Sequence, residues 1–217
     1  LDPSFLPPST QTFLGTDYIG RDVLSRVLWG TRTTVGISLA ATLLASLIGI
    51  TLGIAAAVIG GWIDMILSRA DEVMLAFPSI MLGLIVIAAF GSSIPLLIIL
   101  AGVVYAAGVY RIARALGHDI MVQDFVEAAR ARGEGTWWII SREILPNAAM
   151  PLATDFGLRL IFIILFISSL SFLGLGVQPP IADWGSMVRE NLPGLGNGLS
   201  GGAIACLAPA AAIASLT

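Results

Sequence analysis

The sequence predicts an all-α membrane protein, a polytopic bundle whose helices cross a lipid bilayer several times. Of its 217 residues, 57% are hydrophobic and only 12% are charged, whereas soluble domains usually carry about 25% charged residues. Two long stretches, 33–63 and 73–110, contain no charged residue. Each is long enough for at least one span of about 20 residues. With the apolar stretches nearer the C-terminus, we expect five spans in this chain.

The first 30 residues form a region of their own in this interpretation. Residues 1–20 are rich in Pro, Ser and Thr, which is typical of an extended surface segment. From Asp22 onward, apolar residues recur on one helical face, which predicts a short interfacial helix. The pattern fits equally well with the first turns of the following membrane helix. We therefore divide the chain into an extracytoplasmic segment, 1–30, and a transmembrane domain, 31–217.

The first uncharged stretch carries a row of small residues at every fourth position. Small side chains in such a row let a second helix approach closely, where packing replaces the hydrophobic effect. The alternative is that glycine and alanine are merely common in membrane helices, but the unbroken length of the row favours packing. The row is Ala41, Ala45, Gly49, Gly53, Ala57 and Gly61, and its predicted packing positions are Ala45, Gly49, Gly53 and Ala57.

The second uncharged stretch is too long for one span. Its natural turn is 91–95, which predicts helices near 70–90 and 95–115. Pro78 should kink the first of these helices or mark its early turns. Four charged residues lie near the start of the stretch and predict a local charge cluster near the membrane face, with a proton relay as the less favoured alternative. They are Asp64, Arg69, Asp71 and Glu72.

A polar connection, 117–147, follows and predicts a short helix hairpin. Asp124 can cap the first helix, and Glu127 can return a hydrogen bond to the capping residue. Gly133 supplies a left-handed C-terminal stop. Thr136 is placed to cap the second helix, which Pro146 should end.

The remaining apolar stretches predict the last two spans. One covers 160–175 and starts near Pro151, with Asp155 and Arg159 paired four residues apart. A Gly/Pro-rich loop then runs to Gly202, and its residues Trp184, Met187 and Val188 are suited to the outer membrane interface. The final span begins in 202–216.

The placement of arginines predicts which side of the membrane each connection faces. The polar connection and its flanks carry five arginines, so the positive-inside rule makes this connection cytoplasmic. Alternation then places the 60–70 turn inside and 1–30, 91–95 and 176–200 outside. The five are Arg111, Arg114, Arg130, Arg132 and Arg142.

Several kinds of chemistry are missing from the sequence. There is no lysine, which excludes a Walker A phosphate-binding loop, so any ATP used must bind another polypeptide. Cys206 is the single cysteine and His118 the single histidine, which leaves no intrachain disulfide and no clear metal site. His118 also lies outside the predicted apolar spans, where an intramembrane protease would need its base. We therefore expect no enzyme, no metal and no cofactor in this chain.

Three sequence blocks together resemble one known family. The first is Glu127-Ala128-Ala129 with Gly133 and Ile144-Leu145-Pro146, the cytoplasmic "EAA" loop of membrane subunits in binding-protein-dependent ABC importers. The others are 14–17 with 20–26, and 171–180 with 183–185. In this order they resemble the C-type permease subunit of the dipeptide, oligopeptide and nickel importers. The resemblance covers nearly the whole chain and implies a sixth, N-terminal span that this sequence lacks.

The resemblance implies an ATP-driven importer in the inner membrane of a bacterium. This chain would form half of the translocation path beside a homologous second permease subunit. Two ATPase subunits would bind ATP and Mg, an extracytoplasmic binding protein would deliver substrate, and the lipid bilayer would surround the bundle; no nucleic acid is implied. The residues implied to couple to the ATPase are Asp124, Phe125, Glu127, Ala128, Ala129, Arg130, Arg132 and Gly133.

The substrate and two other function classes stay open at this point. Within the family, di- and oligopeptides are the first expectation, with nickel, metal chelates and opine- or sugar-like solutes as alternatives. A non-transporting membrane scaffold would need the same docking helix. A stand-alone channel or secondary transporter is disfavoured, because the predicted spans contain few charged residues for ion coupling.

Overall fold

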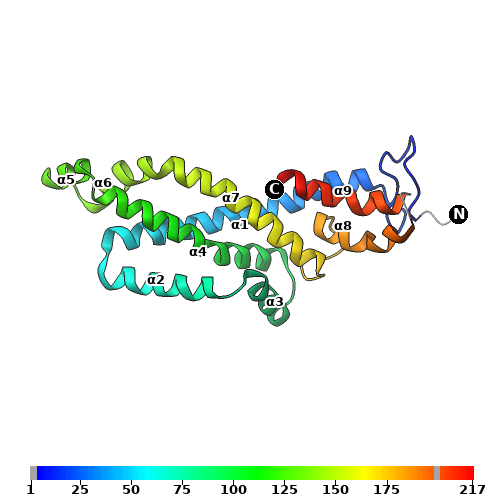
Figure 1. Ribbon diagram of the computed structural model, residues 1–217, viewed down its shortest axis with the longest axis horizontal. Coiled ribbons are helices and arrows are strands. Elements are labelled where there is room, and N and C mark those ends of the chain that lie inside the picture. The colour runs from blue at the N-terminus through cyan, green and yellow to red at the C-terminus, as the bar shows by residue number, and fades with distance from the viewer. Residues whose placement is uncertain (1–3, 198–200) are drawn as a thin grey trace. The chain divides into compact units, whose positions relative to one another are not determined.

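The regular elements of the protein are helices. The computed structural model describes residues 4–197 and 201–217, so the expectations for 1–3 and 198–200 lie outside the described residues. Thr16 and Asp22 form an isolated antiparallel bridge. The elements (Figure 1) are α1 (Val23–Ile59), α2 (Gly61–Ala76), α3 (Ser79–Phe90), α4 (Ile94–Met121), α5 (Asp124–Ala131), α6 (Thr136–Ile139), a π-helical turn (Ile140–Ile144), α7 (Leu145–Phe172), α8 (Trp184–Asn191), a 3-10 turn (Leu192–Asn197) and α9 (Gly201–Leu216).

The predicted class, a helical membrane bundle, is confirmed. Three helices, α1, α4 and the continuous run Thr136–Phe172, are long and apolar enough to cross a membrane. The pair α2 and α3 passes the same test together but is bent by 87°. Helix α9 is apolar and 16 residues long. The described residues thus contain three helices, or up to four spans if the bent pair is one, that are long and apolar enough to cross a membrane. The fifth expected span falls on α9, which is too short to pass the same test, so the number five stays a prediction.

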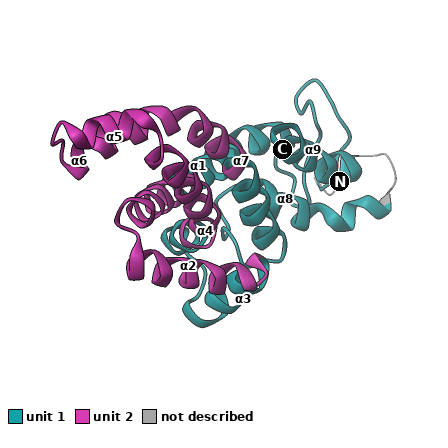
Figure 2. Cartoon of the chain, turned by 60° about the vertical axis from the view of Figure 1, so that its left-hand side comes forward, with its two compact units in different colours: residues 1–41, 80–101, 160–217 teal, residues 42–79, 102–159 magenta. Residues whose placement is uncertain are grey.

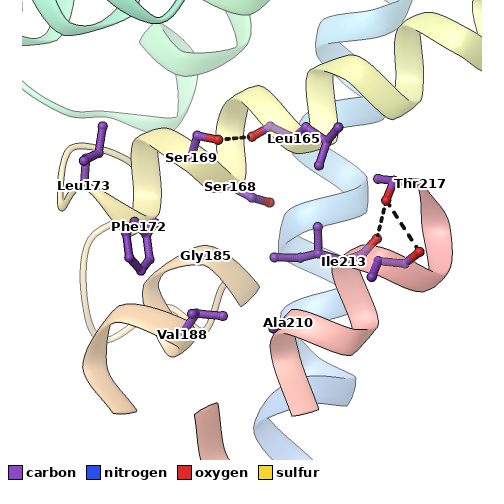
Figure 3. Close-up of a pocket in the computed structure, with 11 residues that line it drawn as sticks. Leu165, Ser168, Ser169, Phe172, Leu173, Gly185, Val188, Ala210, Ile213 and Thr217 are labelled. Atoms are coloured by element: carbon purple, nitrogen blue, oxygen red, sulfur yellow. Dashed lines mark hydrogen bonds between the residues drawn. The ribbon is translucent and has the colours of Figure 1, made fainter. Parts of the chain in front are cut away.

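The chain forms two compact units, each assembled from separate stretches of sequence (Figure 2). The first unit consists of 1–41, 80–101 and 160–217, and the second of 42–79 and 102–159. Helices α1, α4 and α7 each contribute residues to both units. The cytoplasmic hairpin of the prediction, α5 and α6, belongs to the second unit.

Two predicted helix boundaries change in the structure. Of the two interpretations left open for 23–30, the structure has the second: these residues are the first turns of α1 and not a separate interfacial helix. The helix expected near 70–90 is instead two helices, α2 and α3, and the kink expected at Pro78 is present as a break at Phe77 and Pro78 with an 87° bend. Phe77 is extended, with φ −98° and ψ 136°, since a residue before proline is sterically excluded from the helical region.

The helix that begins at Thr136 does not end at Pro146, so that prediction is wrong. It continues through a π-helical turn, 140–144, into α7, which contains both Pro146 and Pro151. A π-helical turn changes the hydrogen-bond spacing of the backbone directly before Pro146. We attribute the continuity of the helix to this π-helical turn. It compensates locally for the backbone hydrogen bond that Pro146 cannot donate, because proline has no N–H.

In the second unit, the small residues of α1 lie against α4. A Cβ atom added at Gly49 would lie 2.5 Å from Val109 Cβ and 2.8 Å from the Ala106 carbonyl oxygen. At Gly53 it would lie 2.6 Å from the Tyr110 carbonyl oxygen. Ala45 and Ala57 of the same row are buried. The two backbones therefore approach closely only because these positions lack larger side chains.

The charged residues of α2 do not form the predicted cluster among themselves. Arg69 pairs with Glu72 on the helix surface, but the two aspartates reach across to α4. Arg114 holds Asp64 through two hydrogen bonds, with Nη2 at 2.6 Å from Oδ2. Arg111 Nη2 lies 3.5 Å from Asp71 Oδ2. The prediction failed because sequence spacing does not show which helix a side chain faces.

In the first unit, α8 packs on the start of α1. The Trp184 indole lies over Gly30, where an added Cβ would be 3.0 Å from its Cδ1, and its Nε1 donates to the Val27 carbonyl at 2.9 Å. Trp184 and Met187 are buried by the chain itself. Trp184 and Met187 therefore do not expose their side chains to a membrane interface, contrary to the prediction, whereas the same expectation for the partly buried Val188 stays a prediction. The expected loop contains helix α8.

Candidate coupling hairpin

A compact apolar core supports the hairpin of α5 and α6. Val126 and Ala129 of α5 are fully buried and meet Ile139 of α6 in one cluster. The other members come from α1, α4 and the run into α7, and they are Ile54, Ala113, Ile144, Ala148 and Leu152. The buried face of this short helix is therefore packed against residues of three long helices within the second unit.

The opposite face of α5 is exposed. Apart from Phe125, the positions around its two buried residues are polar or small, as expected for an amphipathic helix. Ala129 does not belong to this face, because its exposed fraction is 0%. The prediction that Ala129 contacts a partner protein is therefore wrong; its small side chain fits the core instead. The exposed site residues are Asp124, Phe125, Glu127, Ala128, Arg130, Arg132 and Gly133.

The start of α5 differs from the predicted capping box. Gln123 is the N-cap residue, with no side-chain cap hydrogen bond, and Asp124 is the first helical residue. Thr136 likewise follows the N-cap, which is Gly135. Both capping predictions are therefore wrong by one residue. Asp124 and Glu127 still lie in the first turn of α5, where negative charge is favourable next to the helix dipole.

Gly133 ends α5 in the left-handed conformation that the sequence predicts. Its φ is +81°. The Glu134 N–H donates to the Ala129 carbonyl at 3.2 Å and the Gly133 N–H to the Arg130 carbonyl at 2.9 Å. This is the Schellman pattern, in which the left-handed residue closes the helix and reverses the chain. The turn sets the direction in which the chain leaves α5 for α6.

Two tryptophans after the turn were missed as site residues by sequence reasoning. Trp137 is 76% exposed, while Trp138 is partly buried with its ring 5.9 Å from the Arg132 guanidinium carbon. Such a contact favours an ordered arginine on the hairpin surface. Two adjacent tryptophans in a polar connection are the signal that could have marked them, since large exposed apolar residues are typical of contact sites.

The hairpin offers contact surface, not reactive groups. Across residues 4–197 and 201–217, no group of three or more His, Cys, Asp or Glu side chains is arranged to hold a metal. His118 Nε2 lies 3.8 Å from Asp64 Oδ2 near the inner end of α4. The arrangement is suited to binding another protein and to transmitting its movement.

Comparison with known families gives this arrangement a context. Residues 49–217, more than half of the chain, match the family "binding-protein-dependent transport system inner membrane component". The chain belongs to this family. The matched region contains the hairpin and its supporting core. The family and the apolar helices together make this chain part of an integral membrane protein.

Curated relatives of this family member are permease subunits. It is 36% identical over 185 residues to the glutathione transport system permease protein GsiD of Pectobacterium atrosepticum, covering 84% of this chain and 61% of the relative. It is 36% identical over 184 residues to the dipeptide transport system permease protein DppC of Alkalihalophilus pseudofirmus, covering 85% and 60%. The chain thus spans about three fifths of the length of these relatives.

A solved structure shows the same fold. An inward-facing form of the MetNI methionine ABC transporter superposes with a TM-score of 0.67 at 16% identity, covering 89% of this chain and 97% of that one. At this level of identity, the likeness concerns the fold alone.

Proposed function

We propose that this chain is a transmembrane subunit of an ATP-driven importer and forms half of its translocation path. A homologous permease subunit would complete the path, two ATPase subunits would supply energy, and an extracytoplasmic binding protein would deliver cargo. The membrane would be the inner membrane of a bacterium. The observation that carries the proposal is the geometry of α5, which has a buried face fixed to the long helices and an exposed face available to a partner.

The exposed face of α5 is suited to a cleft on an ATPase subunit. Ala128 presents only a methyl group, so a partner surface can approach the helix closely. Phe125 adds an apolar contact, with 40% of its surface exposed. Arg130 and Arg132 can pair with acidic residues at the rim of the contact. Movement of the ATPase would then shift the hairpin as a rigid body and switch the bundle between two packings.

The substrate class that fits best is di- and oligopeptides. The proposal rests on the relatives that are named for glutathione and dipeptide transport. ATP and Mg would bind the ATPase subunits, because this sequence contains no lysine for a Walker A loop. The permease itself would catalyse no reaction and hold no cofactor.

Two hairpin substitutions test the coupling role. Gly133→Val forces a β-branched residue into the left-handed region, at a cost of about 1–2 kcal/mol or more, and so redirects the chain after α5. Glu127→Lys reverses a charge on the exposed face. We expect both variants to reach the membrane and assemble, while peptide uptake per ATP hydrolysed falls severalfold in reconstituted vesicles.

A nearby glycine gives the matched control. Gly135 has φ −77° and open space around its Cα, so Gly135→Val should keep near-normal uptake. Unchanged uptake per ATP in both Gly133→Val and Glu127→Lys would remove the coupling assignment. An equal loss in all three variants would show only that the hairpin must stay folded.

A further inference from the structure

The second unit contains a small apolar cavity with one buried carboxylate in its wall. The cavity lies between α1, α2 and α4 and has a volume of about 160 Å³. Cavities of about 150 Å³ with apolar walls accept molecules the size of benzene. The residues that line the cavity include Ile48, Leu52, Leu67, Met74, Val103 and Asp71.

Asp71 is incompletely satisfied in this position. Its side chain is 7% exposed, and its Oδ1 is buried with no hydrogen-bond partner among the described residues. Its Oδ2 has only Arg111, whose Nη2 lies 3.5 Å away on a side chain that is 63% exposed. A solvent-exposed cation at that distance compensates little of a buried charge, whereas buried charges are normally paired and hydrogen-bonded.

The neighbouring polar groups do not supply the missing donor. Glu72 is an acid and pairs with Arg69 on the outside of α2. Tyr110 also lines the cavity, but its hydroxyl is 3.0 Å from the Ser68 hydroxyl and forms a hydrogen bond there. Asp71 therefore lines the apolar cavity with a carboxylate whose Oδ1 has no hydrogen-bond partner among the described residues.

We propose that this cavity binds a primary ammonium group carried on a small apolar body, with Asp71 as its counter-ion. A primary ammonium brings both a positive charge and the N–H donors that Oδ1 lacks. Its alkyl part fills the space between Leu67, Met74 and Val103. A metal ion fits poorly, because hard cations require several oxygen ligands and no three-residue ligand group occurs in 4–197 or 201–217.

The amino-terminal residue of a peptide has this chemistry. Its ammonium would pair with Asp71, and an apolar first side chain would occupy the cavity. This identification of the ligand rests on the proposed transport of peptides. The binding of small alkylammonium ions does not, because it follows from the cavity and the carboxylate alone.

The test is equilibrium dialysis of radiolabelled 3-methylbutylammonium with the purified transporter that contains the full-length permease. We expect saturable binding at neutral pH that 3-methylbutanol, the neutral analogue, does not displace. Asp71→Asn should weaken the binding at least about 10-fold, as expected when one partner of a buried charged contact is removed. Ala107 also lines the cavity, and Ala107→Leu fills part of its volume while leaving the carboxylate in place. This substitution should weaken amine binding by a similar factor.

A second buried carboxylate provides the matched control. Asp155 is also buried but is fully paired with Arg159, with Nε at 3.1 Å from Oδ1. Asp155→Asn should leave amine binding unchanged. No saturable binding in the unmodified transporter, or equal binding after Asp71→Asn, would overturn the proposal. If the unmodified transporter binds the amine but takes up no peptide, the result would instead contradict the proposed transport of peptides. Failure of the amine site and failure of the proposed function are therefore distinguishable.

Discussion

At the scale of single residues, Asp17 shows how the N-terminal segment is fixed. Its carboxylate is 1% exposed and accepts from the Arg21 backbone N–H at 2.8 Å and from the Arg26 guanidinium at 2.8 Å. Arg26 also contacts Glu190 of α8 at 3.1 Å. Burial alone raises the pKa of Asp17, but the hydrogen bonds from Arg21, Arg26 and Ile19 outweigh it and hold the pKa below 3.8.

This lowered pKa predicts how acid acts on the segment. A carboxylate with a lowered folded pKa stabilises the fold fully above its unfolded value, 3.8, and loses that contribution as the pH falls through the folded value. Hydrogen exchange of residues 4–22, corrected for intrinsic pH dependence, should therefore stay slow from pH 7 to about pH 4 and accelerate only below. Asp17→Asn should accelerate exchange at neutral pH, since breaking a buried pair costs about 3 kcal/mol. Equal exchange in both proteins at pH 7 would contradict the assignment.

At the scale of elements, the contact between α1 and α4 depends on missing side chains. Gly49→Leu would drive a side chain into Val109 and the backbone at Ala106. Overpacking of this kind typically costs about 1–3 kcal/mol, and here it also separates two helices. We expect a lower melting temperature of the purified transporter and reduced assembly.

A glycine elsewhere on α1 provides the comparison. Gly36 belongs to the same helix, and an added Cβ there would meet nothing within 4 Å. Gly36→Leu should leave the melting temperature within experimental error of the unmodified protein. If Gly49→Leu and Gly36→Leu lower the melting temperature equally, the loss is caused by reduced helix flexibility and not by disruption of the α1–α4 contact.

The same element shows why some features could be predicted and others could not. The fourfold spacing of Gly49 and Gly53 is a local pattern, so the close approach could be expected from sequence, although its partner α4 could not. The role of Gly133 could be predicted because a left-handed turn requires a positive φ, which glycine adopts without strain. Ala129 was misplaced because two adjacent alanines are chemically alike, and only the core beneath α5 decides which one is buried.

At the scale of the whole molecule, composition and uncharged stretches were sufficient for the membrane bundle and for most of its helices. The effect of prolines was only partly predictable: the bend at Pro78 was expected, but the continuity of the helix at Pro146 was not, because it depends on the surrounding backbone geometry. Pro78 lies at an 87° bend, whereas Pro146 lies inside a continuous helix that a π-helical turn accommodates. The charged contacts of Asp64 and Asp71 with α4 likewise required the tertiary arrangement.

The central claim is that energy enters this bundle through the exposed face of α5. The direct test uses a transporter in which Cys206, the single cysteine of this sequence, is replaced by serine, and single introduced cysteines carry a short photo-cross-linker. Ala128→Cys lies on the exposed face, Ala129→Cys lies one residue away in the core, and Thr10→Cys is exposed on the N-terminal segment.

On illumination of the assembled transporter, we predict an adduct between the permease and an ATPase subunit for Ala128→Cys, and none for Ala129→Cys or Thr10→Cys. Mass spectrometry of the adduct identifies the partner chain. An ATPase adduct from Thr10→Cys, or none from Ala128→Cys in a transporter that still hydrolyses ATP, would contradict the account.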